Sequence, residues 1–212
     1  MGDQFSCETC RSQACQRPGD AEYPAFCPSA ALSDEMIASV VGKIKNNRKL
    51  SKISLISAEV EGQFYGRLTR VGEMIEFIKR YGAKKIGIAS CVGLLNETRL
   101  LIKIFDKYEI VYYVVGCKVG AVDKSLIGIS DENKLNRGAG HESMCNPIMQ
   151  AELLNAEGTD INIIMGLCVG HDMLFTMHSK APVTTLVVKD RVLQHNPCAA
   201  LYGSEGMYSR FK

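Results

Sequence analysis

Cysteines are the residues of this chain best suited to chemistry: there are nine, and eight of them form two groups of four. The first group lies near the amino terminus in a C-x2-C-x4-C-x11-C pattern, made by Cys7, Cys10, Cys15 and Cys27. The second group is spread along the chain as Cys91, Cys117, Cys145 and Cys168. A cysteine thiolate is both a nucleophile and a metal ligand. Each group therefore predicts either a metal site or a set of reactive thiols.

The amino-terminal group lies in a segment with prolines, glycine and almost no hydrophobic periodicity, so apolar burial alone cannot order it. Four thiolates on one metal centre would supply that order, because ligand-binding free energy becomes folding free energy. Zinc sites usually contain two close cysteine pairs, and here only Cys7 and Cys10 are close. Iron–sulfur clusters accept uneven spacing, and a proline often follows the last ligand, as Pro28 follows Cys27. We expect an iron–sulfur cluster here, with zinc and unligated thiols as alternatives.

Three cysteines of the second group each follow a short apolar run typical of a buried strand. Residues 84–93 bring Cys91, residues 109–120 bring Cys117, and residues 160–172 bring Cys168. We expect strands at 86–89, 110–115 and 161–165, with a helix at 94–108 between the first two. Such a βαβ unit makes its two strands parallel, so their cysteines emerge at one edge of the sheet. Cys145 directly precedes a helix expected at 147–156, where Asn146 is the N-cap.

Helix amino termini favour thiolates, and glycines beside these cysteines leave room for a bound group. We therefore predict a cofactor site, most simply a metal cluster, held by Cys91, Cys117, Cys145 and Cys168. A thiol–disulfide site and plain packing are the alternatives, since free cysteine is often a buried hydrophobe. Cys168 and His171 are the catalytic candidates, and four polar residues could orient ligands or donate protons, or could serve only the fold: His141, Glu142, His171 and Asp172. Cys198 belongs to neither group and is expected in the core or in a helix.

The remaining elements complete an α/β pattern. Helices are expected at 33–46, with Ser33 as N-cap, and at 51–81, ended by Gly82. We also expect a long irregular connection at 118–144 and a short helix at 170–179. After these we expect a strand at 183–188 with a short partner at 192–194, and a last helix that contains Cys198. The fold class predicted is α/β, a three-layer doubly wound (Rossmann-like or flavodoxin-like), mostly parallel sheet. The expected domains are a small Cys-rich metal-binding segment, residues 1–32, and an α/β domain, residues 33–212.

Composition excludes several functions. The net charge is +2, and the one basic stretch, residues 43–52, is best explained as a solvated helix end, so we expect no nucleic-acid partner. No apolar run reaches the ~18 residues that a bilayer requires, and no signal sequence is evident, so we expect a cytoplasmic protein without membrane contact. Metal or redox chemistry, rather than disulfides, then explains the cysteines. Motifs for phosphate-loop nucleotide binding, dinucleotide binding, serine hydrolysis and zinc proteolysis are absent.

The sequence resembles a known family, and the similarity lies in both cysteine groups and in three motifs: C-V-G at 91–93, G-C-K-V-G at 116–120 and L-C-V-G-H-D at 167–172. Over nearly its whole length the chain resembles a cysteine-rich family of predicted metal-binding proteins found in archaea and anaerobic bacteria. The resemblance implies metal at these cysteines and an anaerobic setting, and it implies no substrate.

The function expected is that of an iron–sulfur redox or electron-transfer protein of anaerobic metabolism. Its amino-terminal site would pass electrons or brace the fold, and its inner site would do redox chemistry or bind a small molecule. One alternative is a zinc-stabilised binding module whose inner thiols sense metal or oxidant. Another is a transferase with Cys168 or Cys91 as nucleophile and His171 nearby. The partner would be a redox protein or a small molecule, and a homodimer is compatible with each alternative.

Overall fold

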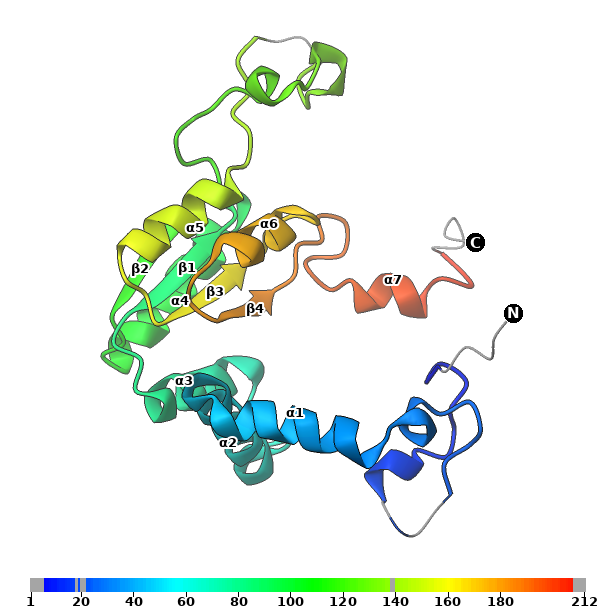
Figure 1. The fold of residues 1–212 in the computed structure, drawn as a ribbon. Helices are drawn as coiled ribbons and strands as arrows, with labels where there is room; N and C mark the ends of the chain where they lie inside the picture. The colour runs from blue at the N-terminus through cyan, green and yellow to red at the C-terminus, as the bar shows by residue number, and fades with distance from the viewer. Residues whose placement is uncertain (1–5, 18, 20–21, 138–139, 208–212) are drawn as a thin grey trace. The chain divides into compact units, whose positions relative to one another are not determined.

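The computed structural model describes residues 6–17, 19, 22–137 and 140–207 (Figure 1). The chain forms two compact units, residues 1–63 and 64–212. The segment expected as a Cys-rich module, residues 1–32, lies within the first unit. Residues 1–5, 18, 20 and 21 of that segment lie outside the described residues.

The first unit contains two helices that begin at polar caps. Helix α1 (Asp34–Asn46) starts where predicted, because Ser33 Oγ accepts a hydrogen bond of 3.3 Å from the Met36 amide. Helix α2 (Arg48–Phe64) starts earlier than the predicted residue 51, because Asn47 Oδ1 accepts from two amides of the first turn, at 3.0 and 3.1 Å. Two short 3-10 turns, η1 (Ala14–Gln16) and η2 (Pro28–Ala31), precede them.

The single helix predicted at 51–81 is wrong, because the chain breaks it in two. Helix α2 ends at Phe64, and Gly66 then adopts a φ of +68°, which a right-handed helix cannot contain. Thr69 Oγ1 caps a new helix, α3 (Arg70–Tyr81), by accepting from the Gly72 amide at 3.4 Å. Apolar residues keep their helical spacing on both sides of the break, so the pattern alone did not reveal it. Gly82 ends α3 as predicted, with φ at 65°.

The second unit contains a four-stranded, all-parallel sheet, which confirms the predicted fold class. Its strands are β1 (Ile86–Ser90), β2 (Tyr112–Gly116), β3 (Ile161–Met165) and β4 (Val183–Val187), in the spatial order β2-β1-β3-β4. Ser90 lies opposite Gly116 on one side and Met165 on the other. The strands β1, β2 and β3 therefore end level with one another, which brings the residues that follow them to one edge.

Helices cover both faces of this sheet, so the unit has three layers (Figure 1). On one face, Ile75 and Ile78 of α3 and Leu101 and Phe105 of α4 (Leu95–Lys107) pack on β1 and β3. On the other face lie α5 (Pro147–Ala156) and α6 (His171–His178), which contribute the core residues Ala151, Leu154 and Phe175. The strand residues alternate between the two faces, as the period of a β-strand requires.

Two connections shape the edge where β1, β2 and β3 end. The long connection 118–144, called the excursion below, leaves β2 and returns to α5, with an antiparallel bridge between Asp123 and Ser143 near its base (Figure 1). It contains the short 3-10 turns η4 (Lys124–Ile127) and η5 (Asp131–Asn133), and another, η3 (Val92–Leu94), joins β1 to α4.

After β4, turns bring Arg191 to Cys168 at the sheet edge, and a short helix, α7 (Cys198–Tyr202), follows. The strand predicted at 192–194 is wrong, because these residues form turns. Asp190 Oδ1 accepts hydrogen bonds from the Val192 and Leu193 amides at 2.9 and 2.8 Å, and Gln194 and His195 have positive φ. Among the described residues, no helix has both the length and the apolar character needed to cross a membrane.

Candidate metal site at the sheet edge

The inner cysteines meet at the point where the strand order reverses. From β1 the chain moves to one side for β2 and then crosses to the other side for β3. In open parallel sheets, ligands bind outside the carboxyl ends of the strands at this reversal. Cys91 directly follows β1, Cys117 directly follows β2, and Cys168 lies shortly after β3. Cys145 reaches the same place because the Asn146 amide donates a hydrogen bond of 2.7 Å to the Cys117 carbonyl.

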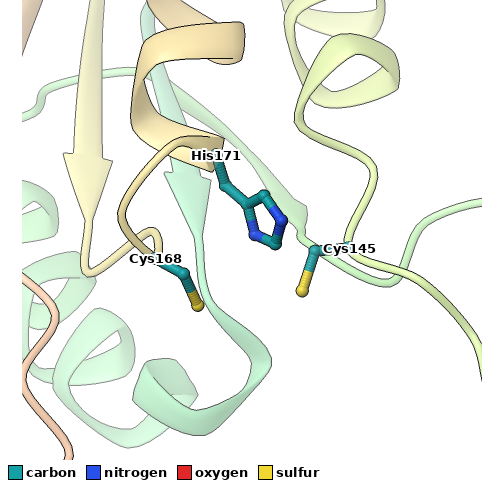
Figure 2. A group of neighbouring side chains, drawn as sticks. All are labelled: Cys145, Cys168 and His171. Atoms are coloured by element: carbon teal, nitrogen blue, oxygen red, sulfur yellow. The ribbon is translucent and has the colours of Figure 1, made fainter. Parts of the chain in front are cut away.

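Three of the side chains form a compact set of metal-ligand atoms. The thiols of Cys145 and Cys168 and a ring nitrogen of His171 all lie within 4.8 Å of one another, and each side chain is half-buried (Figure 2). In the described part of the chain, no other group of three or more Cys, His, Asp or Glu side chains meets this criterion. Cys168 and His171 come from the same short segment at the start of α6, whereas Cys145 comes from the start of α5. Two of the four predicted cofactor ligands, Cys145 and Cys168, and both predicted catalytic candidates, Cys168 and His171, are thus joined.

Cys117 connects this set to the fourth inner cysteine. Its buried thiol makes side-chain hydrogen bonds with both Cys91 and Cys145. The hydrogen bond from Cys117, assisted by Lys189, lowers the pKa of Cys91 to about 5. The hydrogen bond from Cys117, assisted by Lys118 and His171, lowers the pKa of Cys145 to about 5. The pKa of Cys117 itself is raised by its hydrogen bonds to Cys145 and Cys91 and by burial.

The four inner thiols thus form a row along the edge, with Cys117 between Cys91 and Cys145 and with Cys168 near Cys145. One S–H can donate to only one neighbour at a time, so Cys117 shares its proton between Cys91 and Cys145. The amide of Val92 donates to Cys117 Sγ at 3.4 Å, which supplies a further donor to this sulfur. Such a row can bind a soft metal ion, because thiolate is a soft ligand.

Cations that sequence reasoning missed lie beside the row. Arg191 Nη2 donates a hydrogen bond of 2.8 Å to Cys168 Sγ. A Cβ built on Gly93 would lie 3.2 Å from Lys189 Nζ and 3.7 Å from Cys91 Sγ, so the two groups flank the same small space. Lys118 Nζ donates to the Ser143 carbonyl at 2.5 Å, two residues before Cys145. The signal available in the sequence was a pair of basic residues directly after the strand at 183–187.

Gln150 is another residue of the site that the sequence did not reveal. It is fully buried on α5, and its Nε2 donates to the Ser90 carbonyl at 3.2 Å and to the Val115 carbonyl at 2.7 Å. Ser90 is the last residue of β1, directly before Cys91, and Val115 lies near the end of β2, two residues before Cys117. Gln150 therefore holds two strand ends in place, while its Oε1 is buried without a hydrogen-bond partner among the described residues.

The other polar residues considered from the sequence belong to different networks. His141 Nδ1 lies 3.2 Å from Asp123 Oδ2, and Glu142 pairs with Lys124, so both stabilise the excursion. Asp172 Oδ1 accepts from the Met173 amide at 2.9 Å, which is a role in the first turn of α6. Cys198 begins helix α7, as one of the two expectations had it, and its side chain is exposed, so the expectation of a core position is wrong.

The amino-terminal cysteines are not gathered in the same way. Cys27 is buried and Cys10 is half-buried, whereas Cys7 and Cys15 are exposed. Cys7 and Cys10 lie in one turn, because the Cys10 amide donates to the Cys7 carbonyl at 3.1 Å. A hydrogen bond to Ser12 and the nearby Gln13 backbone lower the pKa of Cys10, with the backbone of Gln13 contributing most. A metal at these four residues stays a prediction.

The fold and this edge define a doubly wound α/β protein with thiols at its topological switch point. The chain belongs to the family described as "Protein of unknown function (DUF1847)", whose model matches residues 27–186. It is also similar to "Uncharacterized protein MJ0455" of the archaeon Methanocaldococcus jannaschii, with 44% identity over 198 residues, covering 93% of this chain and 94% of that protein. The expected relationship to an archaeal family is therefore confirmed. The matched span contains the four inner cysteines and Cys27 and excludes Cys7, Cys10 and Cys15.

Proposed function

We propose that this protein binds a metal centre at the sheet edge, with Cys145, Cys168 and His171 among its ligands. The observation that supports this most is the mutual approach of their three ligand atoms to within 4.8 Å. Zinc–sulfur bonds of about 2.3 Å and zinc–nitrogen bonds of about 2.0–2.1 Å place tetrahedral ligand atoms roughly 3.5–3.8 Å apart. Small side-chain rotations would therefore close the set onto one ion.

Cys117 is the best fourth ligand of such a centre. Its thiol contacts that of Cys145, and its burial would shield one side of the metal from water. When Cys117 instead keeps its proton, the fourth position stays open to solvent or to a small molecule. Two thiolates, one imidazole and an open position form a donor set that catalytic zinc uses. The metal would supply a Lewis acid in that case, and the protein groups would fix its ligands and limit access.

An iron–sulfur centre with a redox or electron-transfer role is the first form of this proposal. Its support is the row of four thiols, since such clusters are bound by four cysteines. The resemblance to predicted metal-binding proteins of anaerobes also supports it, as do the amide donor to Cys117 and the cations beside Cys91, Cys145 and Cys168. The amino-terminal cysteines Cys7, Cys10, Cys15 and Cys27 would then hold a second centre. Zinc is the second form, supported by the histidine in the ligand set.

Metal analysis of the full chain tests the proposal and separates its two forms. Protein purified without oxygen is assayed for iron, zinc and acid-labile sulfide, and its visible spectrum is recorded. Iron with sulfide and visible colour supports the iron–sulfur form, whereas zinc without sulfide supports the other. If the protein binds no metal after anaerobic reconstitution with iron and sulfide or with zinc, the proposal is overturned.

Variants then assign the ligands. We expect Cys168→Ser and His171→Ala to lose the metal of the sheet edge while keeping any metal at the amino terminus. Cys198→Ser is the matched control, because its thiol is exposed on α7 and belongs to neither group. Cys7→Ser with Cys10→Ser removes the amino-terminal site and should leave the inner metal in place. Equal metal content in Cys168→Ser, His171→Ala and Cys198→Ser would contradict the assignment.

A further inference from the structure

The cations at the sheet edge exceed what the thiols there require. Lys118, Lys189 and Arg191 all lie against the row of thiols. Within residues 6–17, 19, 22–137 and 140–207, none of these three pairs with a carboxylate. A divalent metal on the Cys145 and Cys168 thiolates would cancel their charge. The three cations would then face only the thiolate of Cys91.

Two carboxylates lie near these residues in the sequence, but in the described part of the chain neither forms an ion pair with one of the three cations. Asp190 precedes Arg191, yet its Oδ1 accepts hydrogen bonds from the Val192 and Leu193 amides. Asp172 follows His171, and its Oδ1 accepts from the Met173 amide. Both carboxylates are thus occupied by the backbone of their own turns.

The backbone adds positive potential to the same edge. Helix α5 begins beside Cys145, helix α6 begins at His171, and α4 begins at Leu95, shortly after Cys91. Each of these helix starts carries the positive end of a helix dipole. Three helix starts and three cationic side chains that pair with no carboxylate of the described residues make this edge electrostatically suited to an anion.

Space and donor geometry indicate a small ligand. Arg191 is exposed and uses Nη2 on Cys168, so Nε and Nη1, which face different sides of the guanidinium, each remain able to donate to an oxygen of a ligand. Lys189 lies close to the exposed residue Gly93, where a Cβ would be 3.2 Å from its Nζ and 3.7 Å from Cys91 Sγ, so its ammonium is at the surface beside Cys91. Gly170, beside Cys168 and His171, has nothing within 4 Å of the position of a Cβ. The free donors of Arg191 and the ammonium of Lys189 therefore lie beside thiols of the row, at the same edge as the metal ligands.

We propose that the sheet edge binds a small carboxylate or inorganic oxyanion beside the metal, held by the guanidinium of Arg191 and the ammonium of Lys189. This rests on the proposed metal site, because the metal neutralises the thiolates that would otherwise repel the anion. The ligand occupies the open side of the Cys145–Cys168–His171 set, where one of its oxygens can reach the metal. The pair Arg191 and Lys189 would thus determine which small molecules the protein accepts.

Calorimetric titration of the full, metal-loaded chain tests this inference, with acetate and inorganic phosphate as separate probes at low salt. We expect binding that weakens with added sodium chloride, and about tenfold or greater loss of affinity in Arg191→Gln and Lys189→Gln. Arg191→Lys should retain part of the affinity, because it keeps the positive charge but loses the additional N–H donors of the guanidinium. Lys103→Gln, an exposed change on the middle of α4, is the charge-matched control and should bind as the unchanged protein does. The ratio of acetate to phosphate affinity identifies which anion class the site prefers.

Metal content measured on the same samples separates the two proposals. Absence of metal overturns the proposed function, whereas metal-loaded protein that binds neither probe overturns the anion site alone. Equal affinity in Arg191→Gln and Lys103→Gln would also overturn it, because binding would then reflect general charge. Circular dichroism of each variant confirms that the fold is retained, and metal-free reduced protein should bind both probes more weakly than the loaded form.

Discussion

The thiol of Cys117 hydrogen-bonds to the thiol of Cys145, although the whole excursion, residues 118–144, separates them in the sequence. The contact is reinforced at the backbone, where the Asn146 amide donates to the Cys117 carbonyl at 2.7 Å. The excursion therefore begins and ends at the thiol row. Its own folding and the geometry of the candidate metal site are coupled through these two residues.

The shared proton of Cys117 predicts a pH dependence of stability in the metal-free, reduced protein. Cys91 and Cys145 have a pKa of about 5 in the folded chain, against about 8.5 for an unfolded cysteine. Between these values the unfolded chain binds more protons, so stability rises with pH. We expect the free energy of unfolding to increase from pH 5 to pH 8, and to be lost as the pH falls through 5.

The variant Cys117→Ala isolates this effect, because it removes the hydrogen bond that contributes most to lowering both pKa values. Urea unfolding at several pH values should show a smaller rise in stability for this variant than for the unchanged protein. Cys198→Ser, with an exposed thiol, should keep the full rise. An identical pH profile in Cys117→Ala would show that the two thiolates do not depend on Cys117.

Local sequence patterns were sufficient for the sheet and for the meeting of the inner cysteines. Each strand is a short apolar run, and a βαβ connection leaves only one edge for Cys91 and Cys117. Asn146 and Pro147 marked the start of α5, and the structure has the Asn146 side chain accepting from the Met149 amide at 3.1 Å. These signals depend on neighbours in the sequence, which explains why they could be read without a structure.

Features that depend on distant parts of the chain could not be predicted. The row of contacts from Cys91 through Cys117 to Cys145 requires the register of β1 with β2 and the closure of the excursion. Arg191 reaches Cys168 only because the turns after β4 bring it back to the edge. The predicted helix at 51–81 is broken near Gly66, which has a positive φ. A glycine permits this conformation, but its presence in the sequence does not show that the conformation is adopted.

The buried side chain of Gln150 predicts a loss of stability when its amide group is replaced by an apolar group. Gln150→Leu removes donors from the Ser90 and Val115 carbonyls, and leaving a buried acceptor unpaired costs about 1–3 kcal/mol. We expect a loss of that size in urea unfolding. Glu152→Gln, on an exposed position of the same helix, should change stability by less than about 0.5 kcal/mol. If Gln150→Leu were as stable as that control, the two hydrogen bonds would make no net contribution.

The close approach of β1 to Asn162 predicts that Gly87 tolerates no side chain. A Cβ at Gly87 would lie 2.0 Å from Asn162 Oδ1 and 2.9 Å from Leu154 Cδ1, both in the core. Overpacking of this kind typically costs about 1–3 kcal/mol, so Gly87→Ala should be destabilised by at least that amount.

A double-mutant cycle with Asn162→Ala checks the cause. Asn162→Ala alone loses hydrogen bonds with Thr159 Oγ1 and Ser179 Oγ, at 2.7 and 2.8 Å, and is destabilised for that reason. The double variant should be less destabilised than the two single losses added, because the atom that clashes is absent. Simple additivity would show that the Gly87 effect arises elsewhere.

The excursion contains a lysine that is almost fully covered and surrounded by acceptors. The side chain of Lys134 is 5% exposed, and its Nζ lies 2.7 Å from Asp131 Oδ1 and 3.6 Å from Asp123 Oδ1. The same nitrogen donates to the Gly140 carbonyl at 3.1 Å, which joins both halves of the excursion. These contacts, with that to Asp131 the largest, raise the pKa of Lys134, so the side chain stays charged at neutral pH.

Lys134→Met should therefore loosen the excursion while leaving the sheet intact. These contacts hold the two halves of the excursion together, and the exposure of Asp131 keeps the expected loss local and small. Hydrogen exchange of the amides of residues 122–126 and 142–144 should accelerate, whereas amides of β1 and β3 should keep their protection. Lys107→Met, exposed at the end of α4, should leave both sets unchanged. Because Cys145 follows this segment directly, Lys134→Met should also weaken metal binding at the sheet edge. Unchanged exchange in the excursion would show that the ion pairs of Lys134 do not hold it together.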